Sequence, residues 1–237
     1  MAETIKPTQT IKLTQTNFVR ENNVYIFGEF DESISSNVVP ELTKLITTES
    51  EKKNGRINFF INSCGGYVKE LHALLALINM AKANNILITT TVLGNAYSCA
   101  SMLAIVGEKR FIYEGAFHLM HLGTATTCIE TFEQNKRNAL KTEKHFNFIV
   151  SLYDRHTKMP KADIIEAVKD NDYYIDAQDC IKLGFADFVI TELYDEDLYK
   201  EKTSKKSKKT SKKKESKIND VKKDKSKKKT TTKRKKA

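Results

Sequence analysis

The sequence lacks the signatures of several large classes of protein. No apolar run approaches the roughly 18 residues that a transmembrane helix needs. The first residues (MAETIKPTQTIKLTQTNF) are polar and do not contain the apolar region of a secretory signal peptide. The four cysteines are far apart and form no CxxC pair, which argues against a disulfide framework and a structural zinc site. We therefore expect a cytoplasmic protein with reduced thiols and no transmembrane segment.

Several catalytic motifs are missing as well. The chain contains neither the phosphate loop GxxxxGK followed by Ser or Thr nor the dinucleotide motif GxGxxG. The nucleophile elbow GxSxG is absent, which disfavours the α/β-hydrolases. No HExxH pair or grouped Cys/His set indicates a metal site. We predict no cofactor and no metal.

Positive charge is scarce outside the last part of the chain. The 237 residues include 40 Lys or Arg and 30 Asp or Glu, for a formal charge of +10. Residues 200–237 alone contain 20 basic and 4 acidic residues. Residues 1–199 therefore hold 20 basic and 26 acidic residues, a net charge of −6. This distribution argues against a basic nucleic-acid-binding domain and assigns the basicity to a tail.

These patterns predict three regions. Residues 1–22 are expected to form a flexible arm, residues 23–193 one folded domain, and residues 194–237 a disordered Lys-rich tail, because the tail has too few apolar residues to form a core. The tail could contact nucleic acid, an anionic membrane surface or an acidic partner. No aromatic residue follows Tyr199, so such binding would be non-specific and salt-sensitive. A purely solvating tail is the alternative.

The body of the chain alternates between predicted strands and helices. Residues 57–61 (INFFI) are typical of a buried strand, residues 67–82 carry apolar side chains at helical spacing, and residues 86–93 are rich in β-branched residues. Apolar residues spaced by seven from Phe132 to Tyr153 predict one packed stripe along a helix. The alternation favours an α/β fold with parallel strands. Further strands are expected at 24–27, 110–113, 116–122 and 185–190, and further helices near 33–46 and at 98–106, 129–158, 161–169 and 176–183.

Two strand–turn–helix junctions could carry chemistry. Residues 62–66 (NSCGG) follow a predicted strand, and their two glycines allow unusual backbone angles and the close approach of a ligand. Amides at such a turn can hold a negative oxygen. In the second junction, residues 94–98 (GNAYS) place Ser98 at the start of a predicted helix. Ser98 is there either a helix N-cap or a nucleophile whose oxyanion meets the helix amides.

The spacing leaves the base and the carboxylate open. His118 and His121 lie on one predicted strand and point to opposite faces, so at most one can face a site near Ser98. Asp172 precedes an apolar element, with Asp170 and Asp176 as rivals, and a solvated turn is the simplest interpretation. The remaining histidines are expected to be exposed on helices: His72, His145 and His156.

Together these segments resemble the proteolytic subunit of the ATP-dependent Clp protease (the ClpP-like serine peptidase family, divergent and possibly of phage type). The resemblance covers roughly residues 24–190 and is collinear. Four matches carry it: residues 62–66 to INSPGG, residues 94–101 to GxAxSMGA, residues 109–111 with 120–121 to KR…MIHQ, and residues 170–187 to ERDxxxSAxEAxxxGLxD.

The resemblance implies a fold and a set of roles. The family fold is the ClpP/crotonase-like spiral of repeated strand–strand–helix units with a projecting handle helix. Residues 129–158 would form that handle. Carried over by position, Ser98 is the nucleophile, His121 the base and Asp172 the orienting carboxylate, and the amides of Gly66 and Cys99 form the oxyanion hole.

The resemblance also implies partners. The expected substrate is unfolded polypeptide, the expected assembly is a homo-oligomeric ring (a heptamer or a double heptamer), and a Clp-type unfoldase ATPase is a possible partner. If the source is a phage, the location is the host cytoplasm. The alternatives are a catalytically inactive ring or scaffold subunit, a crotonase-type acyl-CoA enzyme and a Ser-Lys signal-peptide peptidase. The retained Ser-His-Asp set favours the active peptidase over these three.

This chain departs from the family pattern at several positions. Cys64 stands in place of proline, Cys99 in place of methionine, and the bulky Tyr97 in place of a small residue that would leave more room at the site. Asn171 stands in place of the arginine that the family uses in ring-to-ring contacts, and this substitution argues against double-ring assembly. No clear counterpart of the family's axial loop precedes Val24, which bears on docking to a standard ATPase.

Overall fold

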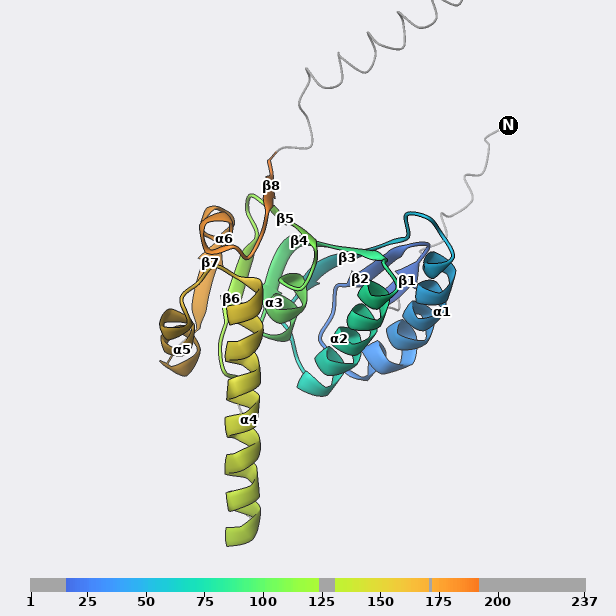
Figure 1. Ribbon diagram of the computed structural model, residues 1–237. Helices are drawn as coiled ribbons and strands as arrows, with labels where there is room; N and C mark the ends of the chain where they lie inside the picture. The colour runs from blue at the N-terminus through green and yellow to red at the C-terminus, as the bar shows by residue number, and fades with distance from the viewer. Residues whose placement is uncertain (1–15, 124–130, 171, 192–237) are drawn as a thin grey trace, which may run out of the picture. The chain divides into compact units, whose positions relative to one another are not determined.

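The computed structural model describes residues 16–123, 131–170 and 172–191 (Figure 1). Within these ranges the chain forms an eight-stranded sheet with the order β1-β2-β3-β4-β5-β8, in which β6 also pairs with β4 and with β7. The strands are β1 (Asn17–Arg20), β2 (Asn23–Ile26), β3 (Arg56–Ser63), β4 (Leu87–Tyr97), β5 (Lys109–Tyr113), β6 (Phe117–Met120), β7 (Tyr173–Asp176) and β8 (Phe188–Ile190).

The predicted α/β class is confirmed, and the sheet is mixed rather than wholly parallel. Five pairs of neighbouring strands are parallel: β2–β3, β3–β4, β4–β5, β4–β6 and β5–β8. Two pairs, β1–β2 and β6–β7, are antiparallel. The parallel pairs need long crossover connections, which is why the strands alternate with helices along the chain.

Helices pack on the sheet and bury the apolar stripes seen in the sequence. Residues Leu71, Leu74 and Ile78 of one helix are buried, as their spacing predicted. Figure 1 shows α1, α2 and α3 beside one another along the strands β1 to β4. The helices are a π-helical turn η1 (Ile34–Val38), α1 (Val39–Ser50), α2 (Val68–Ala83), α3 (Cys99–Ala104), α4 (Phe132–His156), α5 (Lys161–Asp170) and α6 (Ala177–Leu183).

The folded domain begins earlier than residue 23, the boundary expected from the sequence. Strand β1 lies inside the segment that was expected to be a flexible arm. Its first residue, Asn17, is fully buried and donates hydrogen bonds to the carbonyl oxygen of Glu29 at 2.8 Å and to Ser33 Oγ at 2.9 Å. Asn17 is held by partners 12 and 16 residues away, and a local sequence pattern does not predict contacts over such a separation. Residues 194–237, the predicted tail, lie outside the described residues.

Strand β4 is longer than predicted, and its extension reaches the candidate site. The sequence indicated a turn at residues 94–98, but β4 continues to Tyr97 because its last residues pair with β6. Gly94 is needed there, since a Cβ would lie 2.7 Å from Asn62 Oδ1. The same oxygen accepts a hydrogen bond from the amide of Asn95 at 3.0 Å. Residues 173–176, which follow the predicted turn, form β7 by pairing with β6.

Helix α4 is only partly packed. The predicted stripe is wrong at its first two residues, because Phe132 is 80% exposed and Ala139 is exposed, whereas Tyr153 near the other end is 1% exposed. A capping box between Thr131 and Gln134 starts the helix, so its first turns need no core to form. The exposed N-terminal half agrees with the projecting handle that the resemblance implied (Figure 1). No helix in the described ranges is both long enough and apolar enough to cross a membrane.

A partly buried ion pair holds the last strand against the sheet. Arg110 on β5 and Asp187, which precedes β8, form a hydrogen-bonded salt bridge of 2.6 Å. The same guanidinium donates to the carbonyl oxygens of His156 and Gly184. Burial alone would raise the pKa of Asp187, but the hydrogen bonds and charge of Arg110 outweigh it and lower that pKa. Arg110 therefore ties together the ends of α4 and α6 and two strands.

Candidate active site

Ser98 lies between β4 and α3 in a backbone conformation that residues other than glycine rarely adopt. Its φ is 55° and its ψ is −121°. Its amide donates to the carbonyl oxygen of Leu119 on β6 at 2.9 Å. Ser98 is the N-cap residue of α3 by position, but its hydroxyl makes no capping hydrogen bond to the helix. Strained residues of this kind are common at functional sites, so this backbone conformation favours the interpretation of Ser98 as a nucleophile.

The turn at residues 62–66 packs directly against Ser98. Gly65 has a φ of +90°, and a Cβ added there would lie 2.8 Å from Ser98 Cβ and 2.6 Å from the carbonyl oxygen of Tyr97. Gly66 has a φ of +142°, and a Cβ there would lie 2.7 Å from the carbonyl oxygen of Phe30. Both glycines are thus required, one by its approach to Ser98 and both by their backbone conformation.

Two backbone amides next to Ser98 are unused. Cys99 Sγ lies 3.2 Å from the carbonyl oxygen of Gly66, which brings the turn and the start of α3 together. Neither the amide of Gly66 nor that of Cys99 donates a hydrogen bond within the described part of the chain. The first amides of a helix have no intrahelical partner. Burial raises the pKa of the Cys99 thiol to about 11, so this side chain stays neutral and only its amide is available to an anion.

The sheet places His121 opposite Asp172. Strands β6 and β7 are antiparallel, and their last pair is Met120 with Tyr173. Just beyond this pair, His121 follows β6 and Asp172 precedes β7, and His121 Nδ1 lies 3.1 Å from Asp172 Oδ1, a hydrogen-bonding distance. The side chain of His121 is 32% exposed and that of Asp172 is 55% exposed. The imidazole is therefore oriented by a carboxylate while its other nitrogen remains available.

His118 lies on the other face of the same strand, as the odd spacing predicted. It is 1% exposed, its Nδ1 lies 2.9 Å from Ser101 Oγ, and its ring contacts Phe185 edge-on. Burial lowers its pKa to about 3, and the charge of Arg110 adds to this shift. A neutral, enclosed histidine cannot exchange protons with a substrate. The structure thus excludes His118 as the base and leaves His121, which follows the same strand and is partly exposed, as the candidate.

The two halves of the site lie at one end of neighbouring strands. Strands β4 and β6 are parallel, with Tyr97 opposite Leu119, so Ser98 follows β4 at the end where His121 follows β6. Among the described residues, Asp172 is the hydrogen-bonding partner of the His121 ring. No hydrogen bond joins that ring to the Ser98 hydroxyl. The structure brings His121 and Asp172 together and places Ser98 at the end of the neighbouring strand, without a contact between Ser98 and His121.

The remaining candidates have structural roles. Asp176 caps α6, because its carboxylate accepts a hydrogen bond from the amide of Asp179 at 2.8 Å. His72 is exposed, as expected, and its ring lies 4.6 Å from that of Phe148. His145 and His156 on α4 are half-buried rather than exposed, so the expectation for these two histidines was wrong. Burial lowers the pKa of both, with nearby cationic and histidine side chains adding to the shift.

A comparison with protein families finds a match. A family model described as Clp protease matches residues 7–193, a range that includes every residue described above. The chain belongs to the Clp protease family. The resemblance drawn from four sequence motifs is thereby confirmed, and so is the ClpP-like fold. Members of the Clp protease family are in general serine peptidases that form oligomeric rings with ATPase partners.

Hydrogen bonds hold the turn at residues 62–66, where the Clp protease motif has a proline and this chain has Cys64. Cys64, which replaces that proline, is exposed. Ser63 takes over the role of that proline in holding the turn. The Ser63 hydroxyl donates to the carbonyl oxygen of Gly28 at 2.6 Å and accepts from the amide of Gly65 at 3.1 Å. Two hydrogen bonds therefore supply the rigidity that a proline ring would otherwise give.

Tyr97, the bulky departure from the Clp protease motif, stands beside the candidate triad. Its ring contacts that of Tyr174 edge-on, with centroids 5.8 Å apart. Both residues lie in one row across the sheet, because Leu119 pairs with Tyr97 on one side and with Tyr174 on the other. Burial raises the pKa of Tyr97, and the neighbouring Tyr174 and Cys64 add to the shift. The row places aromatic surface next to Ser98.

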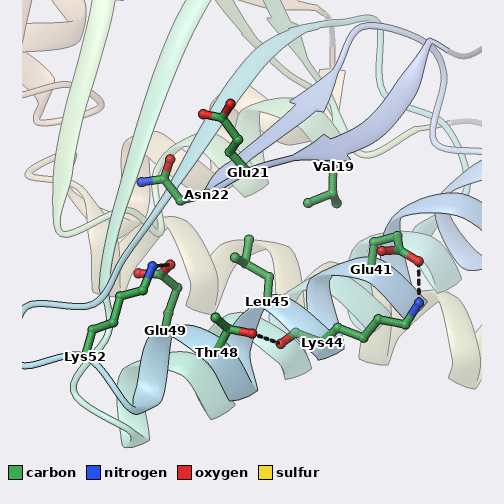
Figure 2. Close-up of a pocket in the computed structure, with 9 residues that line it drawn as sticks. All are labelled: Val19, Glu21, Asn22, Glu41, Lys44, Leu45, Thr48, Glu49 and Lys52. Atoms are coloured by element: carbon green, nitrogen blue, oxygen red, sulfur yellow. Dashed lines mark hydrogen bonds and ion pairs between the residues drawn. The ribbon is translucent and has the colours of Figure 1, made fainter.

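A groove elsewhere on this Clp protease domain carries no comparable chemistry. Figure 2 shows it between α1 and the β1–β2 hairpin, with Val19 and Leu45 facing each other across it. Its volume is about 530 Å³, and its rim is charged, with an ion pair of 2.7 Å between Lys44 and Glu41. Its lining contains no serine, cysteine or histidine. Across the described residues, no three His, Cys, Asp or Glu side chains gather as a metal-ligand set.

Proposed function

We propose that this protein is a serine endopeptidase that cleaves unfolded polypeptides with the triad Ser98, His121 and Asp172. The observation that carries the proposal is the 3.1 Å contact between His121 and Asp172 at the end of the sheet where Ser98 follows β4. The amides of Gly66 and Cys99 are the proposed oxyanion hole. Membership of the Clp protease family supports the reaction class.

The proposed mechanism follows from which atoms are engaged. His121 Nδ1–H donates to Asp172, so Nε2 is free to accept the hydroxyl proton of Ser98 as its oxygen attacks the scissile carbonyl. The two unused amides then receive the negative oxygen of the tetrahedral intermediate. His121 returns the proton to the leaving amine, and the C–N bond breaks. Water, deprotonated by His121, hydrolyses the acyl-enzyme and restores Ser98.

One contact must form before this reaction can begin. The Ser98 hydroxyl and the His121 ring are not hydrogen-bonded in the structure of the isolated chain. Catalytic hydrogen bonds are often long or absent without substrate and shorten in the reactive complex. We infer that substrate or subunit assembly closes this gap. The Asp172 side chain is 55% exposed in the single chain, and burial by a neighbouring subunit would hold it in place.

The assembly is proposed to be a homo-oligomeric ring, a heptamer or a double heptamer, that encloses the active sites. The exposed half of α4, with Phe132 80% exposed, supports this proposal because it offers apolar surface to a second subunit. A Clp-type unfoldase ATPase remains the proposed partner that supplies unfolded substrate. The cytoplasmic location and a phage origin stay predictions from the sequence.

A catalytically inactive ring subunit is the second candidate. The absence of a hydrogen bond between Ser98 and His121 favours it, because an idle subunit needs no such contact. The strained backbone of Ser98 favours the active peptidase, since a residue without a catalytic task would gain stability by relaxing. The difference between the two candidates is therefore the reactivity of one hydroxyl.

Labelling with a fluorophosphonate probe measures that reactivity. The intact mass of the full chain is followed beside Ser98→Ala and beside Ser36→Ala, a control at an exposed serine on η1. We expect a single adduct on the unaltered chain and on the control, and none on Ser98→Ala. No adduct on a folded and assembled protein would favour the inactive subunit. An adduct that persists in Ser98→Ala would refute the assignment of the nucleophile.

The Lys-rich tail, residues 194–237, is proposed to contact nucleic acid or another anionic surface. Its 20 basic residues after residue 199 support this, and a ring would multiply a weak contact by avidity. Retention on double-stranded DNA is measured at rising salt for the full chain and for a chain ending at residue 193. Equal retention of the two would refute the proposal.

A further inference from the structure

Three polar side chains form a network in the core beside the candidate triad, and the mechanism above does not use them. The Tyr153 hydroxyl donates to Ser101 Oγ at 3.0 Å, and Ser101 Oγ lies 2.9 Å from His118 Nδ1. The exposed fractions of the three residues are 1%, 0% and 1% in that order. Tyr153 belongs to α4, Ser101 to α3 and His118 to β6. The network therefore joins three elements that are far apart in the sequence.

The direction of the hydrogen bonds follows from the donors available. Tyr153 donates to Ser101, so the hydroxyl proton of Ser101 is directed to His118 Nδ1, and the neutral His118 carries its own proton on Nε2. Burial raises the pKa of Tyr153, and burial together with Arg110 lowers the pKa of His118. Both groups stay neutral near pH 7, and the pattern of donors and acceptors is fixed there.

Two members of the network, Ser101 and His118, lie three residues from a member of the proposed triad. Ser101 follows Ser98 by three residues and occupies the same turn of α3. His118 precedes His121 by three residues on β6 and its extension. A buried polar group that loses its partner has no water to replace it, so sliding α3 along β6, or either along α4, would break a bond at a large cost. The family motif has alanine at the position of Ser101, so the network is a feature of this chain.

We propose that the network of Tyr153, Ser101 and His118 is a positioning device that holds Ser98 and His121 in reach of each other. Tyr153 anchors both α3 and β6 to the packed end of α4, which fixes the distance over which the proton must pass. These three residues act through Ser98 and His121 and do not contact the substrate. The inference rests on the proposed function, because it concerns the same site.

The test measures the rate constant and the affinity of fluorophosphonate labelling separately. In Tyr153→Phe the ring remains and the hydroxyl is lost, and we expect the rate constant to fall about tenfold with unchanged affinity, because a small displacement of reacting groups slows chemistry and not binding. Tyr25→Phe, on β2 among other aromatic rings, is the matched control and should label at the normal rate.

A second pair of variants separates positioning from packing. His118→Asn places an amide oxygen where Nδ1 accepts, whereas His118→Leu removes the acceptor, and both lose the ring contact with Phe185. We expect His118→Asn to label at several times the rate of His118→Leu. If His118→Leu does not fold, Tyr153→Phe decides the question alone. Circular dichroism at the labelling temperature establishes that each tested variant is folded.

The outcomes distinguish this inference from the proposed function. Normal labelling of the unaltered chain together with normal labelling of folded Tyr153→Phe would overturn the inference and leave the peptidase proposal intact. Slower labelling of Tyr153→Phe that only follows its unfolded fraction would overturn the inference too. Failure of the unaltered chain to label would overturn the proposed function, and the inference with it. A tenfold slower rate constant in a fully folded variant would support both.

Discussion

Replacing Gly65 with alanine tests the packing of the 62–66 turn against Ser98. A Cβ at this position would lie 2.6 Å from the carbonyl oxygen of Tyr97, 2.8 Å from Ser98 Cβ and 3.0 Å from the amide nitrogen of Cys99. Two of these three atoms belong to the backbone and cannot rotate away. The φ of Gly65 is also +90°, a value that alanine rarely adopts. The backbone conformation and the contacts both oppose a side chain here.

The size of the effect follows from these two terms. The positive φ costs an alanine about 1–2 kcal/mol. Overpacking against fixed neighbours typically adds about 1–3 kcal/mol. The lower entropy of the unfolded alanine chain offsets roughly 0.4–1 kcal/mol. We expect Gly65→Ala to lower the free energy of unfolding by about 3 kcal/mol. Because the turn must move away from Ser98, the amide of Gly66 moves with it, and labelling should slow on the order of 10²–10³-fold.

Two other glycines make the experiment specific. Gly123 has a φ of +84° but nothing within 4 Å of its added Cβ, so Gly123→Ala isolates the backbone term. Gly115 has open space and no such φ, so Gly115→Ala should leave stability unchanged or slightly higher. Urea unfolding of the three variants gives the free energies. If Gly65→Ala loses no more stability than Gly123→Ala and labels at the normal rate, the turn does not pack against Ser98.

Three further predictions concern single side chains. Asp172→Asn should slow the labelling of Ser98 about 10⁴-fold, because an amide does not hold the imidazole of His121 in the required tautomer. A time course of intact mass measures the rate, and a normal rate would remove Asp172 from the triad. The free energy of unfolding should fall as the pH drops from about 6.5 toward 3. In the unfolded chain His118 has the ordinary histidine pKa of about 6.5, whereas in the folded chain its pKa is about 3, so protonation favours the unfolded chain. Urea midpoints at several pH values measure this loss, and His118→Asn should flatten the slope. Iodoacetamide at about pH 8 should modify the exposed Cys64 and spare Cys99, which is buried and whose pKa is raised to about 11. Peptide mapping identifies the modified cysteines, and modification of Cys99 would contradict its burial.

Local sequence patterns were sufficient where an element depends on its own residues. The buried face of α2 follows from apolar spacing, and β3 follows from a short β-rich run. The two glycines of the 62–66 turn have the positive φ values that their presence after a strand indicated. The identity of the family followed from motif order and not from any single pattern.

Other features depend on partners that no local pattern contains. Strand β1 is held by Asn17, whose partners Glu29 and Ser33 lie beyond a hairpin. Strand β4 continues through Gly94 because β6 pairs with its end. The stripe on α4 was wrong at Phe132, because heptad spacing shows which residues share a face and does not show whether another element covers it.

The α/β class, the family and a short list of candidate residues follow from the sequence, since these rest on composition, periodicity and motif order. The choice between His118 and His121 needed the fold, because the packing of β6 between β4 and β7 buries His118 and leaves His121 beside Asp172. The structure also showed that the Ser98 hydroxyl caps no helix and that Asp172 meets His121 across the sheet. Spacing along a chain orders residues on one element, whereas a site is made where separate elements meet, and their meeting is set by the packing of the whole domain.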